Sequence, residues 1–351
     1  MTINTIRPGV SAALLITLLG ACGSADSTPA GSTPSTTAST TATTVRDDCG
    51  RDVSVPSPPR RAVALEQGAT EVMLSLGLGD RMVGTSYLTD PVLPELAAQY
   101  AEVPVLAQHY PSPEQFRSAE PDFAYSMLSS AFTPEVAGTR AELAGLGVPA
   151  YVTRLQCEDP AASADFSFDE FYQEVDDIAD VFGVPERAEA LVADQRSQLR
   201  QAEQRAAAVK DDGLSVAWFY STYDGAPIVA GAGGVPDAIG GLLGLHNVFQ
   251  DVDEKWTEVS WEEIAARDPD VIVLADLTRG RPGDSAADKR GILAADPVTS
   301  RLSAVTGRRL IDVPGSALDA SVRSAGAVGT VATAIERLSP SRPSTPTGAS
   351  S

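Results

Sequence analysis

The stretch PERAEALVADQRSQLRQAEQRAAAV, residues 185–209, decides the architecture of this chain. After its first residue it contains neither glycine nor proline, and it is rich in Ala, Glu, Gln, Arg and Leu, which favour a helix. At about 1.5 Å per residue, such a helix would extend roughly 35 to 40 Å, more than the width of one small lobe. We therefore expect one rigid helix that connects two separate lobes.

Short runs of β-forming residues alternate with helical segments on both sides of this helix. The runs are residues 62–65, 82–84, 122–125 and 148–152 before it, and 215–220, 271–274 and 309–313 after it. This alternation is typical of βαβ units with parallel strands, whose ligands lie beyond the carboxyl ends of the strands. The sequence predicts an α/β fold of two Rossmann-like lobes, residues 47–184 and 210–338, with a ligand cleft between them.

Two helix starts are marked by capping patterns. SPEQ at residues 112–115 has an N-cap serine, a proline at the first helical position and an acceptor at the third. SFDE at residues 167–170 is a second capping box. It opens a helix whose apolar residues fall on one face, and Gly183 is placed to end it. This apolar face is expected to be core.

Charge and composition exclude several kinds of protein. The 351 residues include 26 Lys and Arg against 47 Asp and Glu, a formal net charge of −21, and 43% are hydrophobic. A nucleic-acid or anionic-membrane surface would need the opposite charge, and disorder of the whole chain would need far fewer apolar residues. The sequence favours a folded protein that binds no nucleic acid.

The first residues have the pattern of an export signal. Arg7 precedes an apolar run, residues 10–19, that is too short to span a bilayer. LGAC at residues 19–22 resembles the lipobox of bacterial lipoproteins, so residues 1–21 are expected to be removed and Cys22 to carry lipid at the outer face of the cell membrane. The alternative is an ordinary signal peptide with an incidental cysteine.

Two segments have a composition that does not favour folding. Residues 22–46 and 339–351 consist largely of Ser, Thr, Ala, Pro and Gly. Such segments cannot bury enough apolar surface to become ordered. We expect a flexible tether after Cys22 and a disordered tail at the end.

Two cysteines remain after export, Cys49 and Cys157. An even number in an oxidising compartment favours a disulfide, although two buried free thiols are the alternative.

The order of lipobox, tether, lobe, long helix and second lobe resembles the binding proteins for ferric siderophores, haem and cobalamin. The resemblance covers about residues 47–338 and rests on four matches: PRRAVAL (59–65) leading into TEVMLSLGLG (70–79), the joints EPDF (120–123) and DPDV (268–271), the glycine-bearing segment 241–248, and WTEVSWE (256–262).

The resemblance implies delivery of a small-molecule metal chelate to an ABC permease and its ATPase by a lipid-anchored monomer. It places on Glu71 and Glu262 the two carboxylates, one in each lobe, that pair with permease arginines. Both are expected in the first turn of a helix, where a carboxylate also offsets the helix dipole by about 0.3 to 1 kcal/mol without any partner. That structural role is the alternative.

Aromatic residues are concentrated in the loops where a ligand is expected, and an aromatic wall suits a large, partly apolar chelate. Arg323 falls where some members of the resembled family use an arginine, and it could face an anionic oxygen of the chelate. Each aromatic could instead belong to the core. The candidate ligand contacts are Tyr87, His109, Tyr110, Tyr220, Tyr223, Trp256 and Arg323.

The residues also limit which ligand and which activity are expected. With only His109 and His246 as histidines, a site for a bare transition metal is disfavoured, whereas haem could use His109 and Tyr223 as axial ligands. No hydrolase elbow, zinc-protease motif or Walker loop is present, so no enzyme and no cofactor are expected. The leading ligand is a ferric siderophore, with corrinoid or haem as alternatives and a structural or adhesive lipoprotein as the alternative class.

Overall fold

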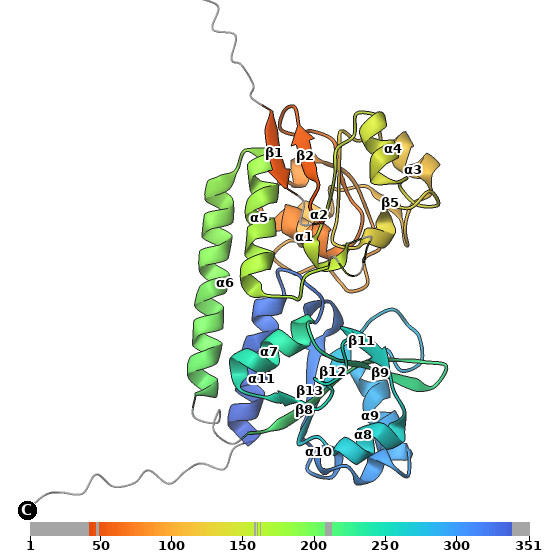
Figure 1. The fold of residues 1–351 in the computed structure, drawn as a ribbon, viewed down its shortest axis with the longest axis vertical. Coiled ribbons are helices and arrows are strands. Elements are labelled where there is room, and N and C mark those ends of the chain that lie inside the picture. The colour runs from red at the N-terminus through yellow and green to blue at the C-terminus, as the bar shows by residue number, and fades with distance from the viewer. Residues whose placement is uncertain are drawn as a thin grey trace, which may run out of the picture. The chain divides into compact units, whose positions relative to one another are not determined.

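The computed structural model describes residues 42–46, 49–157, 159, 161, 163–207 and 213–338. All of them fall in one compact unit. The predicted signal sequence 1–21, Cys22 and the tail 339–351 lie outside the described residues. Figure 1 shows two lobes that are connected along one side by the long helix α6 (Pro185–Ala206).

Lobe one contains a sheet of five parallel strands in the order β5-β4-β3-β6-β7. Every residue of β3, β6 and β7 is buried, as expected for a parallel sheet that is covered on both faces. The strands are β3 (Ala62–Ala64), β4 (Met82–Ser86), β5 (Val105–Ala107), β6 (Phe123–Ser126) and β7 (Ala150–Val152). The helices are α1 (Gln67–Ser75), α2 (Ala97–Tyr100), α3 (Pro113–Ser118), α4 (Arg140–Gly145) and α5 (Phe168–Phe182).

Lobe two contains a mixed sheet in the order β11-β9-β8-β12-β13, with β10 paired to β8. The strands are β8 (Ser215–Tyr223), β9 (Ala226–Ala230), β10 (His246–Asn247), β11 (Trp256–Glu258), β12 (Val271–Asp276) and β13 (Leu310–Pro314). The helices are α7 (Val235–Leu243), α8 (Trp261–Arg267), α9 (Ala286–Ala295), α10 (Ser303–Thr306) and α11 (Ser324–Leu338).

The antiparallel pair β8 and β9 departs from the predicted all-parallel pattern. Asp224 and Gly225 connect the two strands with φ angles of 48° and 87°. Asp-Gly with two positive φ angles is typical of the two-residue hairpin turn that matches the strand twist. The sheet is therefore parallel only across β10, β8, β12 and β13.

The connecting helix α6 (Pro185–Ala206) has 22 residues, which corresponds to about 33 Å. It packs along α5 of lobe one and along α7 and α11 of lobe two. Gln195 Nε2 donates a hydrogen bond of 3.1 Å to the carbonyl of Val322. The predicted end at residue 209 lies outside the described residues, and the described helix ends at Ala206.

The N-terminal hairpin corrects the predicted end of the tether. Residues 43–46 were expected in the tether, but β1 (Thr43–Arg46) pairs antiparallel with β2 (Asp52–Val55). The segment starts with three β-branched residues, which favour a strand, and Val45 is buried in the core. Lobe one therefore begins before residue 47.

The predicted capping box at α3 is confirmed in full, whereas at α5 only the bond to the serine side chain is formed. Ser112 and Gln115 form both hydrogen bonds of a capping box at α3. Ser167 accepts from the backbone N–H of Glu170 at α5, and Gly183 ends that helix with φ of 70°. The apolar face of α5 is buried as expected.

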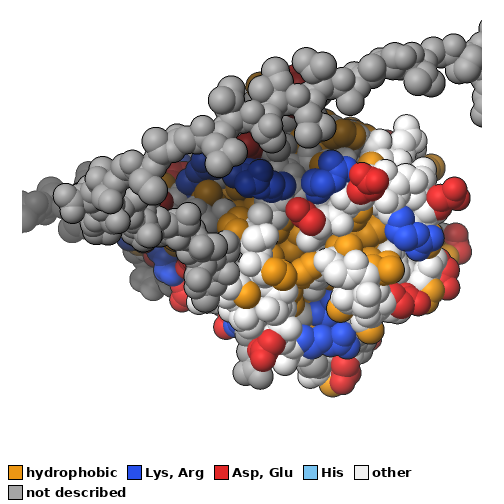
Figure 2. All heavy atoms as spheres, turned by 90° about the horizontal axis from the view of Figure 1, so that it is seen from above, with side chains coloured by type: hydrophobic (Ala, Val, Ile, Leu, Met, Phe, Trp, Pro, Cys, Tyr) orange, Lys and Arg blue, Asp and Glu red, His pale blue; other side chains and the backbone are white. Residues whose placement is uncertain are grey.

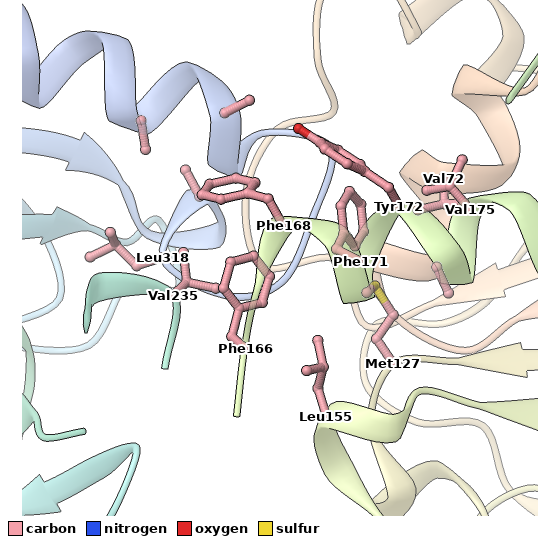
Figure 3. Packing of buried hydrophobic residues seen from close by; sticks show 14 of the residues in the cluster. Val72, Met127, Leu155, Phe166, Phe168, Phe171, Tyr172, Val175, Val235 and Leu318 are labelled. Carbon is pink, nitrogen blue, oxygen red and sulfur yellow. The ribbon is translucent and has the colours of Figure 1, made fainter. Parts of the chain in front are cut away.

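A continuous apolar core crosses from one lobe to the other. Figure 3 shows Phe166 and Phe168, just before and at the start of α5, beside Val235 and Leu318 of lobe two. Met127 of lobe one belongs to the same cluster. Because these side chains are buried together, the cluster opposes separation of the lobes.

Cys49 and Cys157 are joined by a disulfide with Cα atoms 5.4 Å apart. The bond connects the chain just before β2 to the 3₁₀ turn Arg154–Gln156 that follows β7. The pairing is the one that the sequence predicts.

Charge is mixed on the surface seen from above lobe one. On the part of this face left visible, Figure 2 shows Lys and Arg side chains interspersed with Asp and Glu and with apolar patches. The acidic excess of the chain is therefore not gathered into a single acidic field on this face. Among the described residues, no helix combines the length and apolarity needed to cross a membrane.

Candidate functional site

A space of about 250 Å³ lies between the two lobes. Residues of lobe one reach it from just beyond β3, β4, β6 and β7, and residues of lobe two from β8 and β11 and from beyond β12 and β13. This is the position in which α/β lobes bind ligands. The side chains that line it include Glu66, Tyr87, Met127, Leu155 and Phe166 from lobe one, and Tyr220, Val235, Lys255, Trp256, Arg279, Ser316, Leu318 and Asp319 from lobe two.

Apolar side chains from both lobes enclose one side of this space. Phe166 projects between Val235 of lobe two and Leu155 of lobe one (Figure 3). The backbone N–H of Phe166 donates 2.8 Å to the carbonyl of Gly233 in lobe two. The bond fixes this aromatic ring at the junction of the lobes.

Three of the predicted aromatic residues line the space. Tyr220 and Trp256 are neighbours in lobe two, with ring centroids 4.5 Å apart, and Tyr87 faces them from lobe one. Tyr87 has φ of 53°, a left-handed conformation that is unfavourable for a bulky residue. Strain of this kind persists only where the surrounding structure holds it, and it is common at binding sites.

The other predicted aromatic contacts do not line the space. Tyr110 and His109 pack against the ring of Tyr87, with centroid distances of 4.8 and 5.8 Å, and so support it from behind. Tyr223 lies at the end of the β8–β9 hairpin and is 63% exposed. The structure therefore brings Tyr87, Tyr220 and Trp256 together, and it places the remaining three aside.

The predictions for Arg323 and Glu71 are both wrong, because these two side chains pair with each other. Arg323 Nε donates 2.7 Å to Glu71 Oε2, its Nη2 also donates to Glu71 Oε1, and Nη2 donates 2.6 Å to the carbonyl of Pro91. Arg323 therefore does not face a chelate, and Glu71 offers no free oxygen to a permease. α1 begins at Gln67, so Glu71 is in its second turn and points into the protein instead of toward solvent.

Glu66 is a lining residue that the sequence did not reveal. It is the N-cap of α1, and its carboxylate accepts from the backbone N–H groups of Gly68 (2.5 Å), Ala69 (2.7 Å) and Met127 (3.0 Å). Burial raises the pKa of Glu66 in spite of these three bonds, and the nearby charge of Glu71 adds to the rise. A carboxylate thus borders the cleft from the lobe-one side.

Asp319 is its counterpart in lobe two. Asp319 is open to solvent on the side of the cleft, but protein surrounds it on the other sides. This burial is the main cause that raises the pKa of Asp319 to about 6, and the charge of Glu66 is the second. The hydroxyl of Tyr220 lies 3.5 Å from Asp319 Oδ2. The charge of Asp319, with burial, raises the pKa of Tyr220, which stays protonated and able to donate.

The two cations at the cleft are bound by groups of the protein. Arg279 Nη2 donates 2.6 Å to Asp284 and 3.2 Å to Ser221, and its guanidinium lies 5.5 Å from the ring centre of Tyr220. Lys255 Nζ donates 2.7 Å to each of the carbonyls of Leu155 and Ala164 in lobe one. Burial lowers the pKa of Lys255.

A buried lysine lies behind Arg279. Lys289 is fully buried, and its ammonium donates to the carbonyls of Ala275 and Asp284. Burial lowers the pKa of Lys289 to about 8. These bonds anchor the loop that carries Asp284, and thereby hold Arg279 in place.

A metal centre built from protein side chains is not found in the part of the chain that is described. No group of three or more His, Cys, Asp and Glu residues there is arranged to hold an ion.

Glu262 lies on the outer surface, and the carboxylate that corresponds to it in lobe one is not the predicted Glu71. SPE (112–114) followed by EPD (120–122) in lobe one matches SWE (260–262) followed by DPD (268–270) in lobe two, each position 148 residues apart. Ser112 and Ser260 both cap a helix, and Glu114 and Glu262 are both exposed in the first turn.

The strands that follow these two helices also correspond. β6 lies between β3 and β7, and β12 lies between β8 and β13. Glu120 and Asp268, at the same place in the two joints, share positive φ angles of 46° and 35°. Glu114 is therefore the structural equivalent of Glu262, and the repeated Ser-x-Glu pattern is a sequence signal that could have revealed it.

Known proteins that resemble this chain in sequence are substrate-binding proteins. The family model for periplasmic binding proteins matches residues 63–317. An uncharacterized ABC transporter substrate-binding lipoprotein of Bacillus subtilis is 25% identical over 310 residues, 88% of this chain and 90% of the relative.

Solved structures share the fold. A periplasmic binding protein from Veillonella parvula has a TM-score of 0.71 and 30% identity, covering 82% of this chain and 94% of its own. A protein of an ABC-type Fe³⁺-hydroxamate transport system from Saccharomonospora viridis has a TM-score of 0.70 and 24% identity, covering 84% and 98%. At this lower identity the likeness concerns the fold alone.

Proposed function

The chain belongs to the periplasmic binding protein family, and from this premise we propose that it is the substrate-binding lipoprotein of an ABC importer for a ferric siderophore. The observation that carries the proposal is the space between the lobes, enclosed by Tyr87 on one side and by Tyr220 and Trp256 on the other. Because aromatic rings from both lobes converge there, a partly apolar chelate can contact both lobes at once.

Corrinoid and haem remain the alternatives within the same importer type. The proposed axial pair for haem loses support, because His109 packs behind Tyr87 and Tyr223 lies on the exposed hairpin. A corrinoid would need only the aromatic walls and hydrogen-bonding groups. It is the stronger alternative of the two.

Delivery is proposed to use Glu114 and Glu262. Each is an exposed carboxylate in the first turn of a capped helix, one in each lobe, and α3 and α8 lie away from α6 in Figure 1. Two carboxylates on equivalent helices can pair with cations of a two-subunit permease.

Attachment to the membrane is proposed to rest on lipid at Cys22, at the outer face of the cell membrane, with the protein acting as a monomer. The LGAC pattern at residues 19–22 supports the lipid anchor. The net charge of −21 supports it indirectly, because an acidic protein is not attracted to an anionic bilayer.

Native mass spectrometry of the protein purified from iron-starved cells tests the ligand. We expect an added mass that matches an iron chelate and disappears on denaturation. A co-purified corrinoid would replace the siderophore and preserve the importer role. Absence of any ligand, together with failure to bind siderophores, corrinoids and haem in titrations, would favour the structural or adhesive alternative.

A further inference from the structure

We propose that the cleft accepts a positively charged group, an ammonium carried by the ligand, between Asp319 and Glu66 and against the rings of Tyr220 and Trp256. The inference rests on the proposed function, because it names the substrate class for the same cleft. It selects an amine-bearing ferric chelate over an anionic one.

The first observation is that unpaired negative charge faces the space from both lobes. Glu66 accepts only from backbone N–H groups, and Asp319 accepts from the side chains of Tyr220 and Trp256, with the charge of Arg279 acting on it from farther away. Among the ion pairs of the described residues, none includes either carboxylate. The charge of Glu66 contributes to the raised pKa of Asp319, so a cation placed between the two carboxylates would relieve their repulsion.

The second observation is that the cations of the cleft are already bound. Arg279 pairs with Asp284, and Arg323 pairs with Glu71 away from the space. Lys255 directs its ammonium to two carbonyls of lobe one. An anionic ligand could reach only the N–H groups of Arg279 and Lys255 that these bonds leave over, and it would meet Asp319 and Glu66 as well.

The third observation concerns the rings. Tyr220 and Trp256 are adjacent and line the space, and Tyr87 faces them. The faces of Trp and Tyr rings attract cations, and the attraction is stronger when the cation is desolvated. Arg279 already lies 5.5 Å from the ring centre of Tyr220, so this ring has one cation partner, and Trp256 and Tyr87 supply the ring surface for a second.

The fourth observation is a hydroxyl with no partner. Ser316 is 6% exposed and lines the space, and no described residue forms a hydrogen bond with its Oγ. A buried hydroxyl that lacks a partner is costly, so it indicates a place for a ligand group. An ammonium N–H could donate to this oxygen as well as to Asp319.

The size of the space sets how much of the ligand it can take. About 250 Å³ is slightly below the range of roughly 300 to 1,000 Å³ that is typical of sites for drug-sized ligands. A compact cationic arm fits this volume without separation of the lobes. The bulk of a large chelate would need additional room at the mouth of the cleft.

A matched pair of ferric trihydroxamates tests the inference, one with a free primary amine and one with the same amine acetylated. Binding to the purified protein is followed at neutral pH by quenching of tryptophan fluorescence. We expect the amine form to bind about tenfold more tightly or better. In Asp319→Asn that preference should shrink to about threefold or less, whereas Asp253→Asn, an exposed acid in the loop before Trp256, should retain it.

The possible outcomes distinguish failure of the cation inference from failure of the proposed siderophore function. Equal affinity for both chelates in the unaltered protein overturns the inference and leaves the siderophore function standing. Tighter binding of haem or of a ferric tricatecholate also overturns it. If none of these chelates binds, the siderophore function is withdrawn and the inference falls with it. Because the comparison uses the unaltered protein, it holds even if Asp319→Asn folds poorly.

Discussion

Arg323 of lobe two and Glu71 of lobe one form an ion pair in which the two side chains are 8% and 0% exposed. Glu71 also accepts from Gln67 Nε2 at 3.0 Å and from the N–H of Leu93 at 3.3 Å. A further polar contact lies nearby, where Asp90 accepts from the N–H of Ser316 at 2.8 Å. The lobes are therefore joined by satisfied buried polar groups as well as by the apolar core and α6.

Replacing Arg323 with Ala should strongly destabilise the protein. Removal of one partner leaves Glu71 buried and unpaired, which typically costs about 3 to 5 kcal/mol. The free energy of unfolding in urea measures the loss. The double variant Glu71→Leu/Arg323→Met should lose much less, because it leaves no buried charge.

Arg290→Ala is the matched control for this prediction. It breaks an ion pair with Asp312 in which both side chains are well exposed, so it should cost about 1 kcal/mol or less. A similar small loss in Arg323→Ala would contradict the structural role of the buried pair.

The pKa of Asp319 should appear in the pH dependence of stability. Because the pKa of Asp319 is raised to about 6 in the folded protein, its contribution to stability is full below about pH 4 and is lost as the pH rises through 6. Asp319→Asn removes that loss, so the variant should gain stability relative to the unaltered protein between pH 4 and 7. Urea midpoints at several pH values measure it, with Asp253→Asn as control. A difference that does not change with pH would contradict the raised pKa.

The docking proposal predicts a separation of binding from delivery. Glu114→Lys/Glu262→Lys should leave the affinity for the ligand nearly unchanged and abolish both uptake and stimulation of the ATPase. Close interfacial charge pairs contribute several kcal/mol, whereas loss of a carboxylate near a helix N-terminus costs about 1 kcal/mol of stability.

Glu186→Lys is the control for docking, since Glu186 lies in the first turn of α6 and is also exposed. It should transport normally. Normal transport by the double variant as well would show that Glu114 and Glu262 only stabilise their helices.

Sequence patterns predicted the fold well where the signal was local. The Ser112 and Ser167 caps, the apolar face of α5 and the proline-free run of α6 each occupy consecutive residues, and each took the expected form. The hairpin turn at Asp224 and Gly225 was equally local and could have been recognised from its Asp-Gly pair.

The cleft was harder to predict because its members meet only after folding. Glu71 and Glu262 each precede an apolar helical pattern, yet only Glu262 faces solvent. Arg323 of lobe two covers Glu71, whereas no described residue covers Glu262 in the first turn of α8. Arg323 lies 252 residues from Glu71, and no local pattern relates the two. Likewise, Glu66 and Asp319 approach the same space from different lobes.

Anchoring can be tested independently of the described structure. Cys22→Ser should release the protein from the membrane fraction or leave the signal sequence attached, because the lipid is expected on that sulfur. Fractionation and mass spectrometry of the mature N-terminus measure this. Unchanged membrane attachment without a diacylglycerol group would contradict the lipoprotein proposal.

The disulfide should contribute strongly to the stability of lobe one. Cys49 and Cys157 are 108 positions apart in the sequence, and chain-entropy arithmetic for a loop of this length gives up to about 4 to 5 kcal/mol. In a background with Cys22→Ser, only these two cysteines remain, so thiol counting concerns this bond alone. Unfolded, non-reduced protein should show no thiol that alkylates.

Reduction provides the decisive comparison for this bond. Reductant should lower the urea midpoint of the protein with both cysteines, but it should not change that of Cys49→Ser/Cys157→Ser. Because the bond holds the chain before β2 against the turn after β7, its loss should loosen the edge of lobe one without removing the Arg323–Glu71 pair. Ligand affinity should then persist at temperatures where the reduced protein remains folded. Two alkylatable thiols in the non-reduced protein, or equal sensitivity of the double variant to reductant, would show that the bond does not form in solution.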